Sequence, residues 1–265
     1  MAFSQFDYFS NTLKKVVSFN ILLPNDCFSD MIKDNVNYNR QTKILVLLHG
    51  YSGNNKDWLL GSNIQELSIK YNIAVILPSG ENSFYLDGDT GKYGTFVGEE
   101  LINYVRKTFN LSTDKNDTYV GGLSMGGFGA IHIALKHNNI FSKVFALSSA
   151  LIIHEIKNKD ESFSNGVADY SYYRSVFGNL DKLEMSENNP EELIRRLKKK
   201  NEEIPSILMA CGKQDFLIEQ NRAFYNFLID NNIDVYYKED DGVHNWEFWN
   251  KYLEPSIEWL LKDNN

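Results

Sequence analysis

Cysteine is scarce in this sequence. The 265 residues contain 2 cysteines, Cys27 and Cys211, which lie far apart along the chain. This spacing argues against the disulfide framework of a small secreted domain and against a cysteine-based metal cluster. Two isolated thiols suit a reducing compartment, so a cytoplasmic protein is expected.

Long hydrophobic runs are missing as well. No window approaches the roughly 18 uninterrupted apolar residues of a membrane-spanning helix. The first residues, MAFSQFDYFSNTLKKVVSFN, contain neither the apolar segment nor the small-residue cleavage site of a signal peptide. We therefore expect no association with a membrane.

Positive charge is in deficit. Lys and Arg number 27 against 35 Asp and Glu, which gives a net charge of -8 and a pI near 5.2. A negatively charged surface repels the phosphate backbone of a nucleic acid, so nucleic acid is excluded as a partner. The basic run RRLKKK (195–200) lies beside Glu-Glu pairs at helical spacing and predicts the solvated face of a helix.

Proline-rich or glycine-rich linkers, internal repeats and low-complexity tracts are also lacking, so one domain over residues 1–265 is predicted. Apolar residues make up 43% and charged residues 23%, which is ordinary globular usage. Apolar segments of strand length alternate with amphipathic segments of helix length. The expected strands are 16–24, 43–50, 73–80, 117–122, 143–150, 206–212 and 234–240, and the expected helices are 55–71, 96–109, 125–138, 219–232 and 246–262.

The inner strands are continuous runs of Val, Ile and Leu, which is typical of parallel strands covered by helices on both faces. The predicted fold class is therefore α/β with a mostly parallel, doubly wound sheet. The segment 13–23 alternates less cleanly and is compatible with an antiparallel edge. Residues 151–205, which follow the strand at 143–150, are too long for a simple crossover and predict a cap-like insertion.

One motif points to chemistry. In YVGGLSMGGFGA (119–130) a strand ends and a helix begins within a G-x-S-x-G pattern. A strand that enters a helix through so tight a turn strains its apex, and the positions two before and two after must lack side chains. Gly122 and Gly126 meet this demand, and Ser124 becomes an exposed nucleophile at the start of a helix.

A serine hydroxyl needs a base to take its proton and an acid to orient that base. Both are expected downstream, on loops that follow later strands. Of the 5 histidines, His244 alone follows the last strand. Asp215 directly follows the strand at 206–212 and is the preferred acid, with Asp240 and Asp241 as weaker alternatives.

The oxyanion that forms during acyl transfer needs two backbone N–H donors. The first is expected from Met125, which follows the nucleophile. The second is expected from Tyr51, in the loop HGYSGNN after the strand at 43–50, where Gly50 permits the turn.

With these elements in place, the sequence resembles the esterase D group of α/β-hydrolases, and most closely the short-chain tributyrin esterases. The similarity runs nearly from end to end. The motifs that carry it are LLHGYSGN (47–54) with Trp58, GLSMGGFGA (122–130), YYRSVFG (172–178), CGKQDFL (211–217) and HNWEFW (244–249).

The resemblance implies the roles assigned above to Ser124, Asp215 and His244, and hydrolysis of small carboxylic esters with neither a metal nor an organic cofactor. S-formylglutathione hydrolases belong to the same group, but many carry a cysteine after the first HG-type turn, where this chain has Tyr51 and Ser52. An acyltransferase with the same three residues stays an alternative. A non-catalytic binding module is disfavoured because such modules usually lose one of the three.

Bulky aromatic side chains are expected to narrow the acyl site so that acetyl to butyryl groups fit best, although core packing is the alternative for each of them. These predicted substrate-binding residues are Trp58, Phe84, Tyr85, Tyr172, Phe177 and Trp246. The predicted partner is a small-molecule ester. The physiological ester and the formation of a homo-oligomer are left open.

Overall fold

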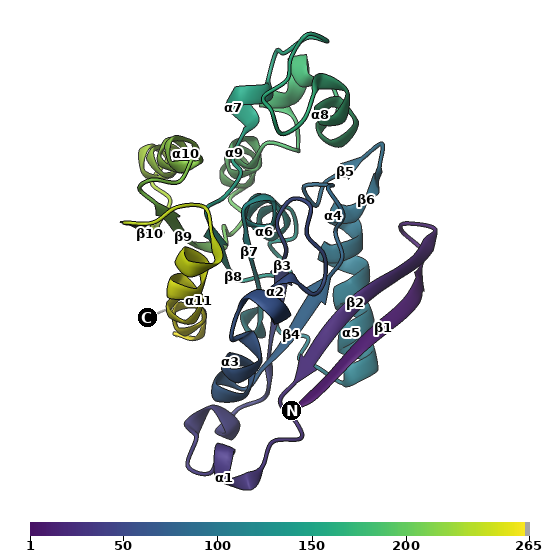
Figure 1. Cartoon of the computed structure of the whole chain (residues 1–265), viewed down its shortest axis with the longest axis vertical. Coiled ribbons are helices and arrows are strands. Elements are labelled where there is room, and N and C mark those ends of the chain that lie inside the picture. Colours follow the sequence, from purple (N-terminus) through teal and green to yellow (C-terminus); the bar gives the residue numbers. More distant parts are fainter. Residues whose placement is uncertain (263–265) are drawn as a thin grey trace.

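A central sheet of eight strands organises the computed structural model, which describes residues 1–262 (Figure 1). Its strand order is β1-β2-β4-β3-β7-β8-β9-β10, and all pairs from β4 to β10 are parallel. This confirms the α/β-hydrolase fold class. The bounds are β1 (Ala2–Ser10), β2 (Lys15–Leu23), β3 (Lys43–Leu48), β4 (Ile73–Pro78), β7 (Thr118–Leu123), β8 (Lys143–Leu147), β9 (Ser206–Gly212) and β10 (Val235–Asp240).

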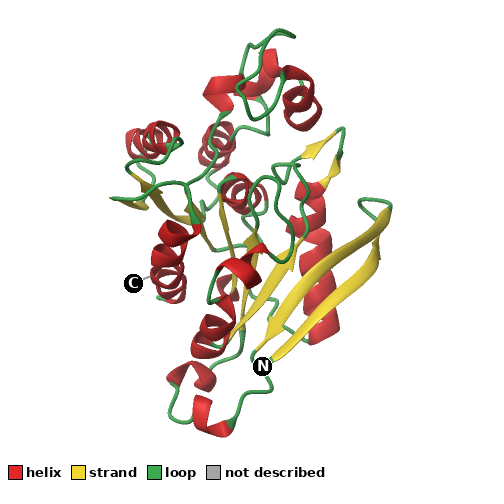
Figure 2. Cartoon of the chain, in the orientation of Figure 1, coloured by secondary structure: helices red, strands yellow, loops and turns green. Residues whose placement is uncertain are grey.

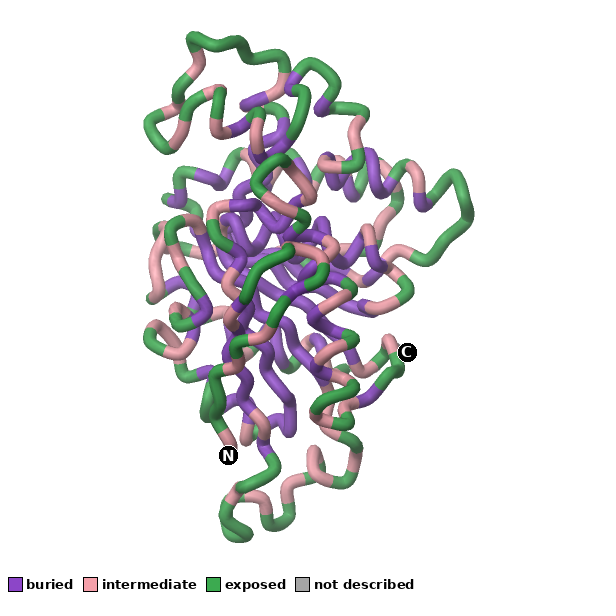
Figure 3. Tube along the Cα trace, turned by 90° about the vertical axis from the view of Figure 1, so that its right-hand side faces the viewer, coloured by how far each residue is buried: buried purple, intermediate pink, exposed green. Residues whose placement is uncertain are grey.

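The inner strands are buried on both faces, as their continuous apolar sequences predict. In β3, Val46 faces one hydrophobic core and Leu47 the other, because successive side chains of a strand point to opposite faces. Figure 3 shows the buried centre of the molecule surrounded by exposed loops.

Helices cover both faces of the sheet (Figure 2). The first core lies under α5 (Ile102–Phe109), α6 (Met125–Lys136), α9 (Pro190–Lys200) and α10 (Ile218–Asp230), and the second under α2 (Asp57–Gly61), α3 (Ile64–Tyr71) and α11 (Trp246–Leu261). The predicted helix at 55–71 is two helices, and the one at 96–109 begins as a π-helical segment, η2 (Phe96–Leu101). None of the helices in residues 1–262 has the length and apolar character that a membrane span requires.

The N-terminal hairpin differs from the sequence-based expectation. Strand β2 is antiparallel as proposed for 13–23, but the edge of the sheet is β1, which pairs with β2 along its whole length. In β1 the partly buried aromatic residues Phe6 and Tyr8 alternate with exposed residues, and both rings pack against Phe19 of β2. The position of β1 is therefore determined by its packing and pairing with β2.

Residues 151–205 contain α7 (Ile153–Ile156), α8 (Tyr170–Phe177), the 3-10 helix η4 (Leu180–Met185) and α9. Helix α9 packs against α6, so it belongs to the helix layer, whereas Figure 1 shows α7 and α8 beyond it at one end of the molecule. The basic residues 198–200 of α9 are exposed, as predicted. The remaining short elements are α1 (Ser29–Ile32), η1 (Val36–Asn39), β5 (Asp87–Gly88), β6 (Gly91–Lys92), α4 (Tyr93–Thr95) and η3 (Lys115–Asp117).

Candidate active site

Ser124 occupies the sharp bend between β7 and α6. Its backbone has φ 54° and ψ -121°, a conformation that costs free energy for any residue with a side chain. Two hydrogen bonds hold it there: the Ser124 amide donates to Leu147 O at 2.9 Å, and the Ala150 amide donates to Ser124 O at 3.0 Å. The end of β8 therefore keeps the serine in its strained position.

The two glycines of the motif are required by close backbone approaches. A Cβ atom on Gly122 would lie 2.3 Å from the carbonyl oxygen of Gly126. A Cβ atom on Gly126 would lie 2.4 Å from the carbonyl oxygen of Leu48. Both distances are far below van der Waals contact, which confirms the reason proposed for these glycines from the sequence.

Ser124, His244 and Asp215 form one hydrogen-bonded row. The distance from Ser124 Oγ to His244 Nε2 is 3.0 Å, and His244 Nδ1 lies 2.9 Å from Asp215 Oδ2 and 3.1 Å from Asp215 Oδ1. Because an ionised carboxylate only accepts hydrogen bonds, Nδ1 carries the imidazole proton and Nε2 is free to accept the serine proton. This is the arrangement that general-base activation of a hydroxyl requires.

The Asp215 side chain is fully buried, yet its environment favours the ionised form. Burial opposes ionisation, but hydrogen bonds from His244 and from the Leu217 amide outweigh it and hold the pKa of Asp215 below its usual value. Asp215 is therefore a carboxylate that orients His244 and can stabilise its cation.

The loops that carry Asp215 and His244 are joined to each other. The Gln214 amide donates to Gly242 O at 3.1 Å, and the Gly242 amide donates to Gln214 Oε1 at 2.8 Å. Asp240, the alternative acid, pairs instead with Lys251, while the exposed Asp241 lies 3.7 Å from Lys213. Of the three acids considered, Asp215 is the one that hydrogen-bonds to His244.

The four other histidines have different partners. The ring of His132 is buried and bonded to the carbonyl of Glu187, and His137 is buried beside Glu99. His154 lies in the insertion, 2.7 Å from Glu191. Their contacts are those of packing and surface residues.

The fourth histidine, His49, holds the loop of the predicted oxyanion hole in place through two hydrogen bonds. The Gly80 amide donates to its Nε2 at 2.8 Å, so Nδ1 carries the proton and donates it to Gly50 O, also at 2.8 Å. Burial lowers the pKa of His49, which keeps the ring neutral and able to make both bonds. A Cβ on Gly50 would lie 3.5 Å from Ser124 Cβ, so this loop runs beside the serine.

The two predicted oxyanion donors both belong to the wall of the cavity that contains Ser124. Met125 is the first residue of α6, where backbone N–H groups have no acceptor one turn earlier in the helix. Tyr51 follows Gly50 in the loop after β3, which His49 holds in place. Their positions suit the predicted role, which stays a prediction.

The cavity has a volume of about 440 Å³. The insertion supplies part of its wall, and the loops after β3, β4, β7, β8, β9 and β10 supply most of the rest. It is lined by Tyr51, Phe84, Ser124, Met125, Ala150, Ile152, Glu155, Asn165, Val167, Tyr173, Phe216, Leu217, Gln220 and His244.

Of the six aromatic residues expected at the pocket, Phe84 lines this cavity. Trp58 is buried and donates to Leu48 O, with Trp246 packed against its ring. Tyr85 and Phe177 are also buried, and Tyr172 donates to Asn82 O and packs edge-to-face against the ring of Tyr51. Substrate binding by these five residues stays a prediction, and their contacts are those of packed structural residues.

The sequence reasoning missed several residues of the site. Glu155, Asn165 and Gln220 line the cavity but belong to no motif, so nothing in their local sequence signals them. Asn221 is fully buried and joins the loop after β8 to α10. Because the burial of Asn221 is known only from the structure, no sequence signal could have identified this role.

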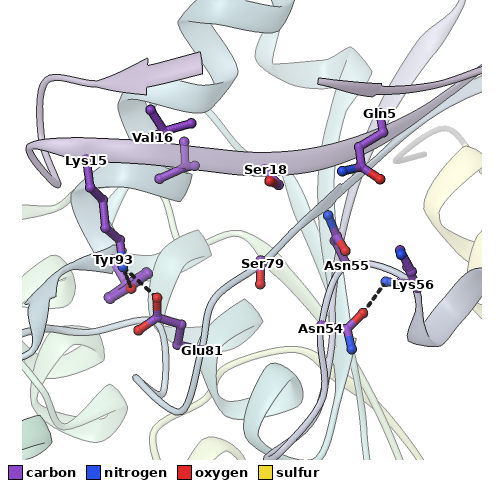
Figure 4. A pocket seen from close by; sticks show the side chains of 11 residues that line it. Gln5, Lys15, Val16, Ser18, Asn54, Asn55, Lys56, Ser79, Glu81 and Tyr93 are labelled. Atoms are coloured by element: carbon purple, nitrogen blue, oxygen red, sulfur yellow. Dashed lines mark hydrogen bonds and ion pairs between the residues drawn. The ribbon is translucent and has the colours of Figure 1, made fainter. Parts of the chain in front are cut away.

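A second hollow, of about 420 Å³, lies between the N-terminal hairpin and the loops after β3 and β4 (Figure 4). Its wall is largely polar, and Lys15 donates there to Glu81 at 2.5 Å and to the Tyr93 hydroxyl at 2.8 Å. Asn54 accepts from the Lys56 amide on the opposite side. These contacts connect β2 to the loop after β4, which indicates a structural role for the residues of this hollow.

Among residues 1–262, no group of three or more His, Cys, Asp or Glu side chains is arranged to hold a metal ion.

Comparisons with known proteins agree with this geometry. Residues 10–260 match the model of the Esterase family, described as "Putative esterase". The chain is 46% identical over 264 residues to an acetyl esterase of Caldicellulosiruptor saccharolyticus, with 99% of each chain covered.

Solved structures of serine hydrolases are also similar. FphF, a fluorophosphonate-binding serine hydrolase of Staphylococcus aureus solved with bound substrate, superposes with a TM-score of 0.85 at 27% identity over 99% of both chains. The S-formylglutathione hydrolase FrmB of the same organism superposes with a TM-score of 0.81 at 25% identity, over 98% of this chain and 99% of FrmB. The chain therefore belongs to the Esterase family: it is a carboxylic ester hydrolase, a serine esterase of the esterase D type with the α/β-hydrolase fold.

Proposed function

We propose that the enzyme hydrolyses esters of short-chain carboxylic acids through an acyl-enzyme formed on Ser124. The observation that supports this most directly is the hydrogen-bonded row of Ser124, His244 and Asp215 at the wall of a cavity. The likeness to an acetyl esterase over the whole chain supports the short acyl group.

In the first half-reaction, Ser124 Oγ attacks the ester carbonyl while His244 Nε2 accepts its proton. The carbonyl oxygen becomes negative and receives hydrogen bonds from the Met125 and Tyr51 amides, which strengthen as the charge develops. Asp215 stabilises the imidazolium and holds its orientation. His244 then gives the proton to the departing alkoxide, and the alcohol leaves.

In the second half-reaction, water takes the place of the alcohol. His244 Nε2 accepts a proton from the water as its oxygen attacks the acyl carbonyl, and the tetrahedral intermediate collapses. The bond from Ser124 Oγ to the acyl carbon breaks, and His244 returns the proton to Oγ. The carboxylic acid is released and the enzyme is regenerated.

The composition of the cavity supports a limit on acyl length. Its wall is apolar at Phe84, Met125 and Ile152, but it also contains the Glu155 carboxylate and the Asn165 amide. A long alkyl chain would displace water from these polar groups without replacing its hydrogen bonds, which costs free energy. Acetyl to butyryl groups avoid this cost.

The test is a panel of p-nitrophenyl esters from acetate to decanoate. We expect kcat/KM to be highest between acetate and butyrate, and Ser124→Ala to abolish both turnover and labelling by a fluorophosphonate probe. Maximal kcat/KM at octanoate or decanoate would contradict the short-chain proposal. Full activity of Ser124→Ala would contradict the assignment of the nucleophile.

A second candidate is hydrolysis of S-formylglutathione, which the structural likeness to FrmB favours. The same row of residues would attack a thioester carbonyl equally well, and formyl is a very small acyl group. Direct comparison of S-formylglutathione with p-nitrophenyl acetate distinguishes the two candidates, because a kcat/KM at least about 100-fold higher for the thioester would identify it as the preferred substrate.

A further inference from the structure

Strand β1 forms one open edge of the central sheet. It pairs with β2 along its whole length, and within residues 1–262 no further strand pairs with its other side. Figure 1 shows β1 at the outer border of the molecule, on the side opposite β10. The outward backbone groups of β1 are therefore available to a strand from another chain.

The hydrogen bonds of β2 show which residues of β1 direct their backbone groups outward. The Ser79 amide donates to Ser18 O at 3.3 Å, so Ser18 directs its backbone groups toward the β4 side. Successive residues of a strand alternate in this respect, so Phe19 directs its groups toward β1, where it pairs with Phe6. By the same alternation, the residues of β1 whose N–H and C=O groups lie on the open edge are Phe3, Gln5, Asp7 and Phe9.

This edge lacks the features that usually keep an edge strand from pairing with another chain. Such features are Lys or Pro residues, β-bulges and very short strands. The sequence of β1, AFSQFDYFS, contains neither Lys nor Pro, and its register with β2 has no bulge. The side chains of Phe3 and Phe9 have exposed fractions of 51% and 55%. The edge is therefore long, partly apolar and unprotected.

The edge is also complementary to itself. When two copies of β1 run antiparallel about a two-fold axis at Phe6, Phe3 lies opposite Phe9 of the second copy, and Gln5 lies opposite Asp7. All of these pairs join residues whose backbone groups point outward, so each pair can exchange two hydrogen bonds. Because residues two apart share a face of the strand, the aromatic side chains of each pair also meet on one face.

Other registers satisfy these requirements less well. With the two-fold axis between two residues, outward groups would face inward ones. With the axis at Asp7, the two Asp7 carboxylates would lie opposite each other and repel. With the axis at Gln5, Phe9 would have no partner in the opposite strand. The axis at Phe6 instead places the Gln5 amide opposite Asp7, which accepts from the Ser18 hydroxyl and can accept further hydrogen bonds.

We propose that two copies of this chain associate through β1, so that their sheets continue as one sheet across a two-fold axis at Phe6. In β2, Leu22 neighbours Phe3 and Val16 neighbours Phe9, so each aromatic pair completes an apolar row across four strands. The residues that line the cavity of Ser124 include none from β1 or β2, so the association leaves both cavities open.

Sedimentation velocity of the full chain tests the proposal. At about 50 µM, wild-type protein should have twice the mass of one 30.6 kDa chain, with a Kd below about 10 µM. Gln5→Pro removes an outward N–H without removing a bond to β2, and should raise the Kd by about 100-fold or more. Phe3→Lys replaces an exposed side chain at the interface and should raise it by about 30-fold or more.

A charge pair tests the register. Phe3→Lys and Phe9→Asp should each weaken the dimer alone. In the double variant, each new cation lies opposite a new anion of the other copy, so the affinity should exceed that of Phe3→Lys by about fivefold or more. Hydrogen exchange gives a second readout, because the outward amides of β1 should be protected in the wild-type dimer and exchange rapidly in Phe3→Lys.

Tyr236→Lys is the matched control, because Tyr236 is an exposed aromatic residue of β10, the opposite edge of the sheet. It should leave the dimer intact. Circular dichroism shows whether each variant is folded; should Gln5→Pro not fold, Phe3→Lys decides, since its side chain is exposed. Wild-type protein that stays monomeric at about 50 µM, or a dimer that survives Phe3→Lys, would overturn the inference. Dissociation in Tyr236→Lys would overturn it as well, because the other edge would then form the interface.

Discussion

Asn221 binds the backbone of Ser149 through both atoms of its amide. Its Nδ2 donates to Ser149 O at 2.9 Å, and its Oδ1 accepts from the Ser149 amide at 3.2 Å. Both residues are fully buried. The contact joins the loop after β8, which hydrogen-bonds to the backbone of Ser124, to the first turns of α10, which follow Asp215.

Replacing Asn221 should therefore destabilise the enzyme strongly. Asn221→Leu leaves the buried N–H of Ser149 without its partner and removes one of the two hydrogen bonds that the Ser149 C=O accepts, so we expect the free energy of unfolding to fall by about 1 to 3 kcal/mol. Urea unfolding followed by circular dichroism measures this loss. Asn226→Leu, an exposed position on the same helix, should change it by less than about 0.5 kcal/mol. Equal effects of the two substitutions would contradict the role of the Asn221 contact.

The bend at Ser124 should not tolerate a methyl group at Gly126. The new Cβ would meet the backbone oxygen of Leu48, which cannot move alone, so we expect Gly126→Ala to lose about 1 to 3 kcal/mol of stability. The displaced nucleophile should also lower kcat by about 100-fold. Gly178→Ala is the control, since its Cβ meets open space and only its positive φ is strained. It should cost about 1 to 2 kcal/mol and leave kcat unchanged.

The same substitution at Asp215 and at Asp240 shows which of the two acids orients His244. In Asp215→Asn, the amide can donate to His244 Nδ1 and so favours the tautomer that cannot accept the proton of Ser124. We expect kcat to fall by about 10⁴-fold at neutral pH. Asp240→Asn removes only the exposed pairing with Lys251 and should keep kcat within about twofold. A large loss in Asp240→Asn alone would reverse the assignment of the acid.

Lowering the pH should remove the contribution of the Asp215 carboxylate to the free energy of unfolding. An unfolded aspartate titrates near pH 3.9, and the folded-state pKa of Asp215 lies lower. The carboxylate therefore stabilises the fold fully above about pH 4, and this contribution is lost as the pH falls through the folded-state value. Unfolding free energies measured between pH 5 and pH 3 should decline more steeply in wild-type enzyme than in Asp215→Asn. Parallel curves would show that Asp215 contributes no such dependence.

The Ser124 bend could be predicted from sequence because its requirements are local. Backbone crowding at Gly122 and Gly126 excludes every larger residue, so the geometry leaves a pattern within five positions of the chain. Asp215 and His244 could be predicted because the carboxyl ends of parallel strands meet at one edge of the sheet. Their positions relative to the strands were sufficient without any knowledge of side-chain contacts.

The wall of the cavity could not be predicted in the same way. Trp58 and Phe84 are both buried aromatic residues, and the sequence does not show that the second also reaches the wall of the cavity while the first does not. Glu155 belongs to the insertion and Gln220 to α10, and only the folded chain brings their side chains within 3.5 Å of each other. Strand β1 was missed for a related reason, since the exposed residues Gln5 and Asp7 interrupt its apolar sequence and are tolerated there because β1 is at the edge of the sheet.

The parallel order of β7, β8, β9 and β10 has a kinetic consequence. Ser124, Asp215 and His244 follow three different strands, and the loop of His244 comes after the outermost one, β10. Such long-range pairings form slowly because distant parts of the chain must first come together. Recovery of esterase activity during refolding thus reports completion of the whole C-terminal half of the sheet, and it lags behind the return of helical signal.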